Sequence, residues 1–125
     1  MAYALDVVPR GTYLYISVTG ENSVDTVSNY LAEVQEWCQR LNCANVLIVE
    51  NLEGPSLTTS SVYGVVSKIS NQPDRIAGKI AYVDLNPLHD AAVLKFGEDV
   101  AVNRGVSARV FATVSEAEAW LESQI

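Results

Sequence analysis

Residues 45–50, Asn-Val-Leu-Ile-Val-Glu, decide the fold of this 125-residue chain. The short aliphatic run is typical of a β-strand, and it is continuous enough to be apolar on both faces of a sheet. Such strands occur in parallel sheets that are covered by helices. We therefore expect residues 45–50 to form the central strand of an α/β domain, followed by a loop over residues 51–56.

The sequence before this strand predicts a hairpin and a helix. Residues 3–8 and residues 12–19 are of strand type and flank a turn at residues 9–11. Asn22 or Ser23 is a candidate N-cap, because either side chain can accept a hydrogen bond from a free backbone N–H. The inner face of this helix is predicted from apolar residues spaced by threes and fours, Val24, Val27, Leu31, Val34, Cys38 and Leu41.

The next segment predicts a second helix and a further strand. Thr58, Thr59 or Ser60 is its candidate cap, since each has a side-chain oxygen that can accept from a free N–H. Residues 79–83 then form an apolar segment of strand type. The inner face of the second helix is predicted to consist of Val62, Val65, Val66 and Ile69.

A third helix and a final strand-helix pair complete the chain. Residues 84–87 are typical of a turn in which Pro87 takes the first helical position, and residues 108–111 form the last strand. Thr113 and Glu116 have the spacing of a capping box. The alternation predicts one domain, with a mostly parallel sheet packed by helices. The expected inward residues are Leu88, Ala92, Phe96 and Val100 in the third helix and Val114, Ala117 and Leu121 in the fourth.

Composition and charge exclude several classes of function. With 15 acidic and 8 basic residues the net charge is -7, which disfavours nucleic acid and anionic lipid as partners. The first residues do not resemble a secretion signal, and no apolar run reaches the length of a membrane span. We expect a cytoplasmic protein with no nucleic-acid partner and no membrane span.

The cysteine and histidine content gives no sign of a metal centre. Cys38 and Cys43 lie near the end of the first helix at a spacing that does not favour a disulfide, so we expect free thiols, with Cys38 buried. Two cysteines and one histidine do not supply the four ligands of a structural zinc site. Motifs for nucleotide phosphates or calcium are also absent, so no metal and no cofactor is expected.

The order of elements from the second strand onward resembles the SpoIIAA-like family of small bacterial proteins, also called STAS/SEC14-like. The C-terminal segment carries the same likeness, with Val-Phe-Ala-Thr at residues 110–113 and Glu-Ala-Trp-Leu at residues 118–121. The resemblance covers nearly the whole chain. It implies a mostly parallel five-stranded sheet with an N-terminal antiparallel hairpin and about four helices. It also implies a non-enzymatic regulatory or protein-interaction module of the anti-sigma-factor-antagonist type.

The resemblance also implies a phosphorylation or partner site. Anti-sigma-factor antagonists carry a D-S-S-G-x-G segment whose first serine is phosphorylated by a partner kinase. Residues 59–64, Thr-Ser-Ser-Val-Tyr-Gly, occupy the corresponding place, which points to Ser60 with Thr59 and Ser61 beside it. Thr59 replaces the aspartate and Val62 replaces the first glycine. The alternative is that these hydroxyls serve only to cap the helix.

Three aromatic residues are candidates for a partner surface. Tyr30 and Trp37 lie seven residues apart on the first helix, off the apolar stripe, where they would form an exposed aromatic strip. Tyr63 follows the serines. Such a surface would bind a protein partner or form a homodimer, whereas the alternative places these rings at the edge of the core.

Ligands of open α/β sheets bind beyond the carboxyl ends of the parallel strands, here residues 51–59 and 84–90. Ser56, Asp84 and His89 are the candidate ligand-binding residues of these loops. We expect His89 to be a surface residue in the first turn of the third helix. A remote alternative is a small hydrolase, which would require a serine within hydrogen-bond reach of His89.

The likeness to SEC14-type lipid-binding domains implies another alternative, a carrier or sensor of a small apolar, lipid-like ligand. Such a ligand would lie between the helices and the sheet, where small side chains leave room. Close packing of the third helix on the sheet is the competing explanation. The small residues in question are Ala91, Ala92, Gly97 and Ala101.

Overall fold

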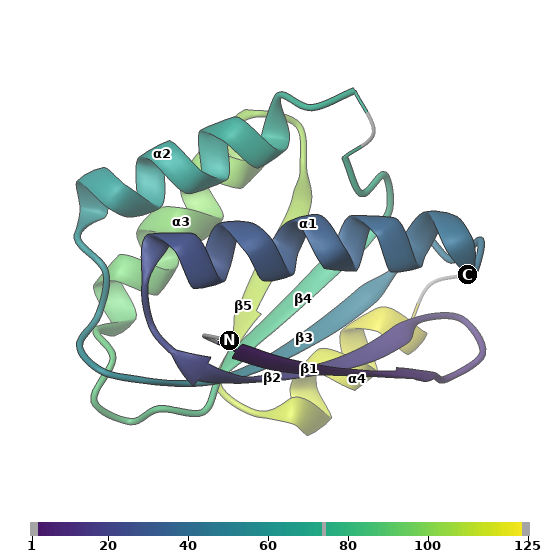
Figure 1. Ribbon diagram of the computed structural model, residues 1–125. Helices are drawn as coiled ribbons and strands as arrows, with labels where there is room; N and C mark the ends of the chain where they lie inside the picture. Colours follow the sequence, from purple (N-terminus) through teal and green to yellow (C-terminus); the bar gives the residue numbers. More distant parts are fainter. Residues whose placement is uncertain (1–2, 74, 124–125) are drawn as a thin grey trace.

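The computed structural model describes residues 3–73 and 75–123 (Figure 1). Strands and helices alternate along the chain after an initial hairpin, as the sequence predicts. The elements are β1 (Tyr3–Pro9), β2 (Leu14–Glu21), α1 (Val24–Arg40), β3 (Val46–Glu53), α2 (Thr59–Ser70), β4 (Lys79–Asp84), α3 (Ala91–Asn103), β5 (Ser107–Phe111) and α4 (Val114–Glu122).

The strands form one sheet in the order β1-β2-β3-β4-β5, with β1 antiparallel to β2 and every other pair parallel. This confirms a small α/β domain with a five-stranded, mostly parallel sheet. Residues 46–50 are buried in its central strand, as predicted. However, β3 continues through residues 51–53, which were expected to be a loop, because β2 extends as far as Glu21 and pairs with Glu53.

Three helices cover one face of the sheet and the fourth covers the other (Figure 1). Each parallel strand is added on the same side of its predecessor, and right-handed crossovers in one direction place α1, α2 and α3 on a single face. The helix α4 follows the last strand and makes no crossover. It packs Ala117 and Leu121 against the opposite face, as the sequence predicts.

Side-chain caps define where the helices begin. Asp90 caps α3 by accepting a hydrogen bond from the Ala92 N–H, so α3 begins at Ala91 and the expectation of Pro87 as the first helical residue is wrong. The Asn86 side chain instead accepts from the Leu88 N–H and holds a turn there. This turn leaves Leu88, expected to be inward, 85% exposed. The predicted caps of the other helices are confirmed at Ser23, Thr58 and Thr113.

The cysteines are as the sequence predicts. Both Cys38 and Cys43 are free thiols, and Cys38 is buried. None of the helices in the described part of the chain is long and apolar enough to cross a membrane.

The helix α2 is the outer member of the three-helix layer. It packs mainly against α1 and α3 rather than on the strands, and Figure 1 shows it farthest from the sheet. A cavity lies between the apolar face of α2 and the strands.

Candidate functional site

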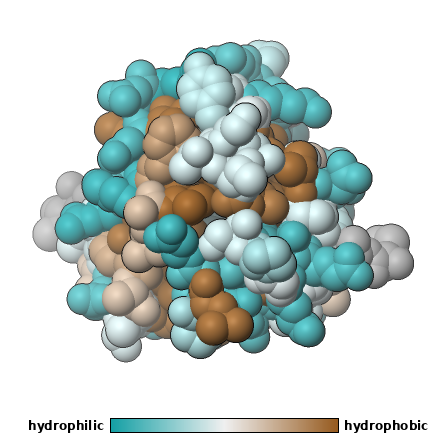
Figure 2. All heavy atoms as spheres, turned by 90° about the vertical axis from the view of Figure 1, so that its left-hand side faces the viewer, coloured by the Kyte–Doolittle hydropathy of each residue, from teal (hydrophilic) through white to brown (hydrophobic). Residues whose placement is uncertain are grey.

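A cavity of about 190 Å³ occupies the space beneath α2. Its floor is formed by β3, β4 and β5, its walls by α1 and α3, and its roof by α2. It reaches the carboxyl ends of the strands, where Asn22, Ser56 and Asp90 line it. Figure 2 views that end of the molecule and shows apolar side chains gathered in the centre, with hydrophilic ones around them. The roof consists of the predicted inner residues of α2, Val62, Val65, Val66 and Ile69.

Small side chains on α3 contribute to the cavity, but only two of the four that the sequence suggested. Gly97 and Ala101 line it, whereas Ala91 and Ala92 are exposed at the start of α3. The late start of α3 explains this difference, because the two alanines are its first residues and the part of the helix that lines the cavity begins at Val93. A Cβ atom on Gly97 would lie 3.1 Å from Val62 Cγ1, so glycine allows α3 and α2 to approach closely.

The cavity suits a small molecule. An enclosed apolar cavity of about 150 Å³ is sufficient to bind benzene, whereas sites for drug-sized ligands span roughly 300–1,000 Å³. The volume of about 190 Å³ therefore fits a ligand slightly larger than benzene. A long acyl chain requires more room than this conformation provides.

A buried carboxyl group lies in the floor of this cavity. Glu50 of β3 is only 3% exposed, and its Oε2 accepts a hydrogen bond from the hydroxyl of Tyr30 on α1. Burial raises the pKa of Glu50, hydrogen bonds from Tyr30 and Tyr82 lower it, and the charge of Asp84 raises it again, with a net increase. Burial also holds the pKa of both tyrosines well above the usual value, so both are neutral hydrogen-bond donors.

Asp84 and His89 form an ion pair next to Glu50. Asp84 is the β4 register partner of Glu50, so the two side chains lie on the same face of the sheet. His89 Nδ1 lies 2.6 Å from Asp84 Oδ2, and His89 Nε2 lies 2.8 Å from the Gly54 carbonyl oxygen. Acceptors at both ring nitrogens favour the form of the imidazole that carries two protons and a positive charge.

The environment of His89 supports this protonation state. Burial lowers its pKa, but the hydrogen bonds to Asp84 and to the Gly54 carbonyl, together with the charges of Asp84 and Glu50, outweigh that effect and raise it. The expectation of a surface histidine is wrong, since its side chain is 3% exposed. The reason is that His89 precedes the cap of α3 and turns back over the strand ends.

The serine that a hydrolase would need does not lie beside His89. Ser56 Oγ accepts a hydrogen bond from the Asp90 N–H at 2.7 Å, which joins the loop before α2 to the loop before α3. In the described part of the chain, the polar atoms within hydrogen-bond distance of the His89 ring belong to Asp84, Gly54, Asn22 and Asn86.

The side chains of Glu50, Asp84 and His89 also form a group whose ligand atoms lie within 4.8 Å of one another, close enough to consider a metal ion. However, the Nδ1 and Oδ2 atoms are 2.6 Å apart. Two ligands of a tetrahedral ion with bonds of about 2.1 Å are separated by roughly 3.4 Å. The His89 and Asp84 side chains are therefore arranged as hydrogen-bonding partners and not as two ligands of one ion.

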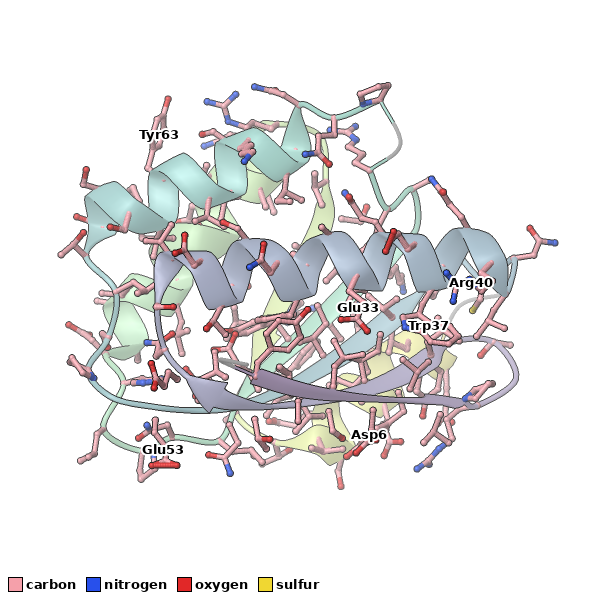
Figure 3. The ribbon with its side chains drawn as sticks, viewed as in Figure 1. Asp6, Glu33, Trp37, Arg40, Glu53 and Tyr63 are labelled. Atoms are coloured by element: carbon pink, nitrogen blue, oxygen red, sulfur yellow. The ribbon has the colours of Figure 1, made fainter. Side chains whose placement is uncertain are left out.

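The candidate phosphorylation residues lie in the first turn of α2, outside the cavity. Thr59 and Ser60 are exposed, while the Ser61 N–H donates a hydrogen bond to Oγ1 of the cap Thr58. Tyr63 is 49% exposed, and Figure 3 shows its ring directed away from the body of the molecule.

The predicted aromatic strip on α1 is wrong, because Tyr30 is completely buried. Trp37 is partly covered by the Arg40 guanidinium, which lies 4.8 Å from the centre of its ring (Figure 3). The buried face of α1 includes Thr26, Tyr30, Val34 and Cys38 at intervals of four residues. Val24 and Leu41, expected on that face, are exposed.

Sequence reasoning missed Glu50, Tyr30 and Tyr82 as site residues. The available signal was the acid at the end of the aliphatic run, because a carboxyl group in a buried strand requires polar partners. Comparison of the sequence with protein-family models and with curated proteins gives no match.

Proposed function

We propose that this protein is a non-enzymatic binding or sensing domain for a small, mostly apolar molecule held beneath α2. The cavity of about 190 Å³ is the observation that carries this proposal. Protein interiors are normally packed as densely as organic crystals. An apolar void costs about 24 cal/mol per Å³, so an unfilled space of this size costs a few kcal/mol, which a ligand would recover.

The polar groups of the site support binding rather than catalysis. His89 is held between Asp84 and the Gly54 carbonyl oxygen, and Ser56 serves as an acceptor for a backbone N–H. A general base needs a free nitrogen directed at the proton that it removes. The pair instead fixes two loops at the end of the cavity beside the carboxyl ends of the strands.

The proposal includes the SpoIIAA-like (STAS/SEC14-like) family and a cytoplasmic location. The sequential strand order after an antiparallel hairpin supports this family assignment. The packing of two aromatic residues near the C-terminus of the chain also supports it. The rings of Phe111 and Trp120 lie 5.5 Å apart. The free thiols Cys38 and Cys43 support a reducing compartment.

Titration of the ¹⁵N-labelled protein with benzyl alcohol tests this function, because the molecule is neutral and slightly larger than benzene. We expect chemical-shift changes at Val62, Val65 and Ala101. Ala101→Leu fills the cavity and weakens binding by at least about tenfold, whereas Ala92→Leu adds the same bulk to an exposed position of the same helix and has no such effect. Absence of binding by the unmodified chain would contradict the proposal.

A second candidate function is a protein-interaction module, and the exposure of Ser60 and Tyr63 on one side of α2 favours it. A phosphate on Ser60 would face the positive end of the helix dipole and its free N–H groups. The same surface is the candidate contact for a protein partner or for a homodimer.

Native mass spectrometry of protein purified gently from its host tests this second function. A phosphorylated or partner-bound fraction should disappear in Ser60→Ala. Ser115→Ala is the matched control, because Ser115 occupies the same second position of α4. An unmodified monomer in every preparation would count against the interaction module.

A further inference from the structure

The chemistry of the cavity floor indicates which class of ligand the cavity accepts, an inference that rests on the proposed binding function. Side chains alternate along β3, so Ile48 and Glu50 face the cavity while Val49 faces α4. An acid in this position places a potential negative charge in a cavity whose exposed lining is mostly apolar.

Glu50 forms no ion pair with a cationic side chain in the described part of the chain. The nearby positive charge of His89 is already paired with Asp84. A charged carboxylate in an apolar interior is costly unless it is paired.

The other ionisable groups that line the cavity are also engaged. Arg75 donates to the Ser70 and Arg104 carbonyl oxygens, and Glu98 accepts from Lys95 and from the Val110 N–H. Arg109 lies over the Phe111 ring, and Asp90 caps α3. A cation that pairs with Glu50 would therefore come from outside the cavity lining.

Two tyrosines prepare Glu50 for a negative charge. The Tyr30 hydroxyl of α1 donates a hydrogen bond to its carboxyl group, and the nearby Tyr82 hydroxyl of β4 also lowers the pKa of that group. Donors of this kind favour the ionised form of a carboxyl group, in opposition to burial. A cation in the cavity would add to the effect of the tyrosines, and the net charge of -7 favours the approach of cations.

We propose that the ligand is a small apolar molecule with one protonated amine, which pairs with the Glu50 carboxylate while its hydrocarbon part packs against α2. The ammonium group donates N–H···O hydrogen bonds and keeps its own proton. Where Glu50 is protonated before binding, its proton is released to solvent as the pair forms. No covalent bond is made or broken.

Anionic ligands are disfavoured by the same geometry, because their charge would lie beside Glu50 and its register partner Asp84. A neutral ligand of equal size would gain binding free energy only from burial of its apolar surface. Molecules that share one ring but differ in charge can therefore distinguish these classes of ligand.

Calorimetric titration of the full chain with benzylamine, benzyl alcohol and benzoate is the test. We expect benzylamine to bind at least about tenfold more tightly than benzyl alcohol, and benzoate not to bind. Glu50→Gln should weaken benzylamine at least about tenfold and leave benzyl alcohol unchanged. The control is Glu53→Gln, which changes the net charge equally. Glu53 is exposed, and Figure 3 shows it on the side of the sheet opposite α2.

The outcomes separate the two proposals. If benzyl alcohol binds and benzylamine binds no more tightly, the amine inference is wrong and the binding function stands. If none of the three binds, the binding function is wrong as well. Proton release, measured from binding heats in buffers of different ionisation enthalpy, uses only the unmodified protein and does not depend on folding of the variant. Release with benzylamine but not with benzyl alcohol supports the inference, and equal release with both overturns it.

Discussion

His89 Nδ1 and Asp84 Oδ2 are 2.6 Å apart in a part of the molecule almost closed to solvent. Through its second ring nitrogen His89 also reaches the Gly54 carbonyl oxygen, so one side chain joins β4 to the loop that leads into α2. The imidazolium ring thereby holds in place the loop from which α2 begins.

Because of this bond, we expect the free energy of unfolding to fall as the pH rises. The folded-state pKa of His89 is raised above its usual value of 6.5, so its contribution is complete below about pH 6.5 and is lost as the pH passes the raised pKa. We expect the free energy of unfolding of His89→Ala in urea to be about 2 kcal/mol below that of the unmodified protein at pH 6. This deficit should narrow at higher pH, and a deficit independent of pH would contradict the assignment.

Glu50 adds a second pH dependence with the same sign. Because its folded-state pKa is raised, the folded protein holds this proton more tightly than the unfolded chain does, and stability is lost as the pH rises through the raised pKa. Glu50→Gln cannot ionise. Its free energy of unfolding should therefore increase relative to that of the unmodified protein between pH 5 and pH 8. Glu53→Gln controls for the change in net charge, and equal behaviour of the two variants would refute the prediction.

Two glycine substitutions should change stability in opposite directions. A Cβ on Gly78 would meet the Asn45 side chain and would lie 2.5 Å from the Ala44 carbonyl oxygen, so Gly78→Ala should cost about 2 kcal/mol in thermal or urea unfolding. Gly64 lies in α2 with open space at its Cβ position. Gly64→Ala should stabilise the protein by about 0.5–1 kcal/mol. A stabilised Gly78→Ala would show that Ala44 and Asn45 can move away from the added Cβ atom.

The two thiols should differ in reactivity. Burial, with a smaller effect from the nearby Cys43, raises the pKa of Cys38 to about 11, so about one Cys38 thiol in a thousand is ionised at pH 8. A maleimide followed by mass spectrometry of peptides should label Cys43 first in the native protein and both residues in urea. Equal native rates at the two positions would indicate that α1 opens readily.

Much of the fold could be predicted because local signals agree with the final packing. The aliphatic run at residues 46–49 could only be buried, and the Glu116 N–H donates to the Thr113 side chain at the start of α4, as expected. The start of α3 could not be predicted from the proline rule. The side chains of Asp84 and Asn86 accept from the Asn86 and Leu88 N–H groups in competition with a helix, and this competition depends on side-chain geometry.

The cavity and its polar floor were harder to predict than the fold. The sequence predicts the apolar face of α2, but the distance of α2 from the sheet depends on how α1 and α3 pack against this helix. The sequence predicts Tyr30 at the surface, because its neighbours Val27 and Leu31 mark a stripe that misses it by one position. Only the structure shows that its hydroxyl has a partner, Glu50, twenty residues away in the chain.

The separation of α2 from the strands has a consequence for re-engineering the protein. Four residues of one short helix, Val62, Val65, Val66 and Ile69, form the ceiling of the chamber, while the strand ladder beneath it is held together by other parts of the chain. A library confined to these four positions would change the shape and depth of the chamber and leave the sheet hydrogen bonds intact. The domain is thus a compact scaffold whose ligand specificity can be changed by substitutions in a single helix.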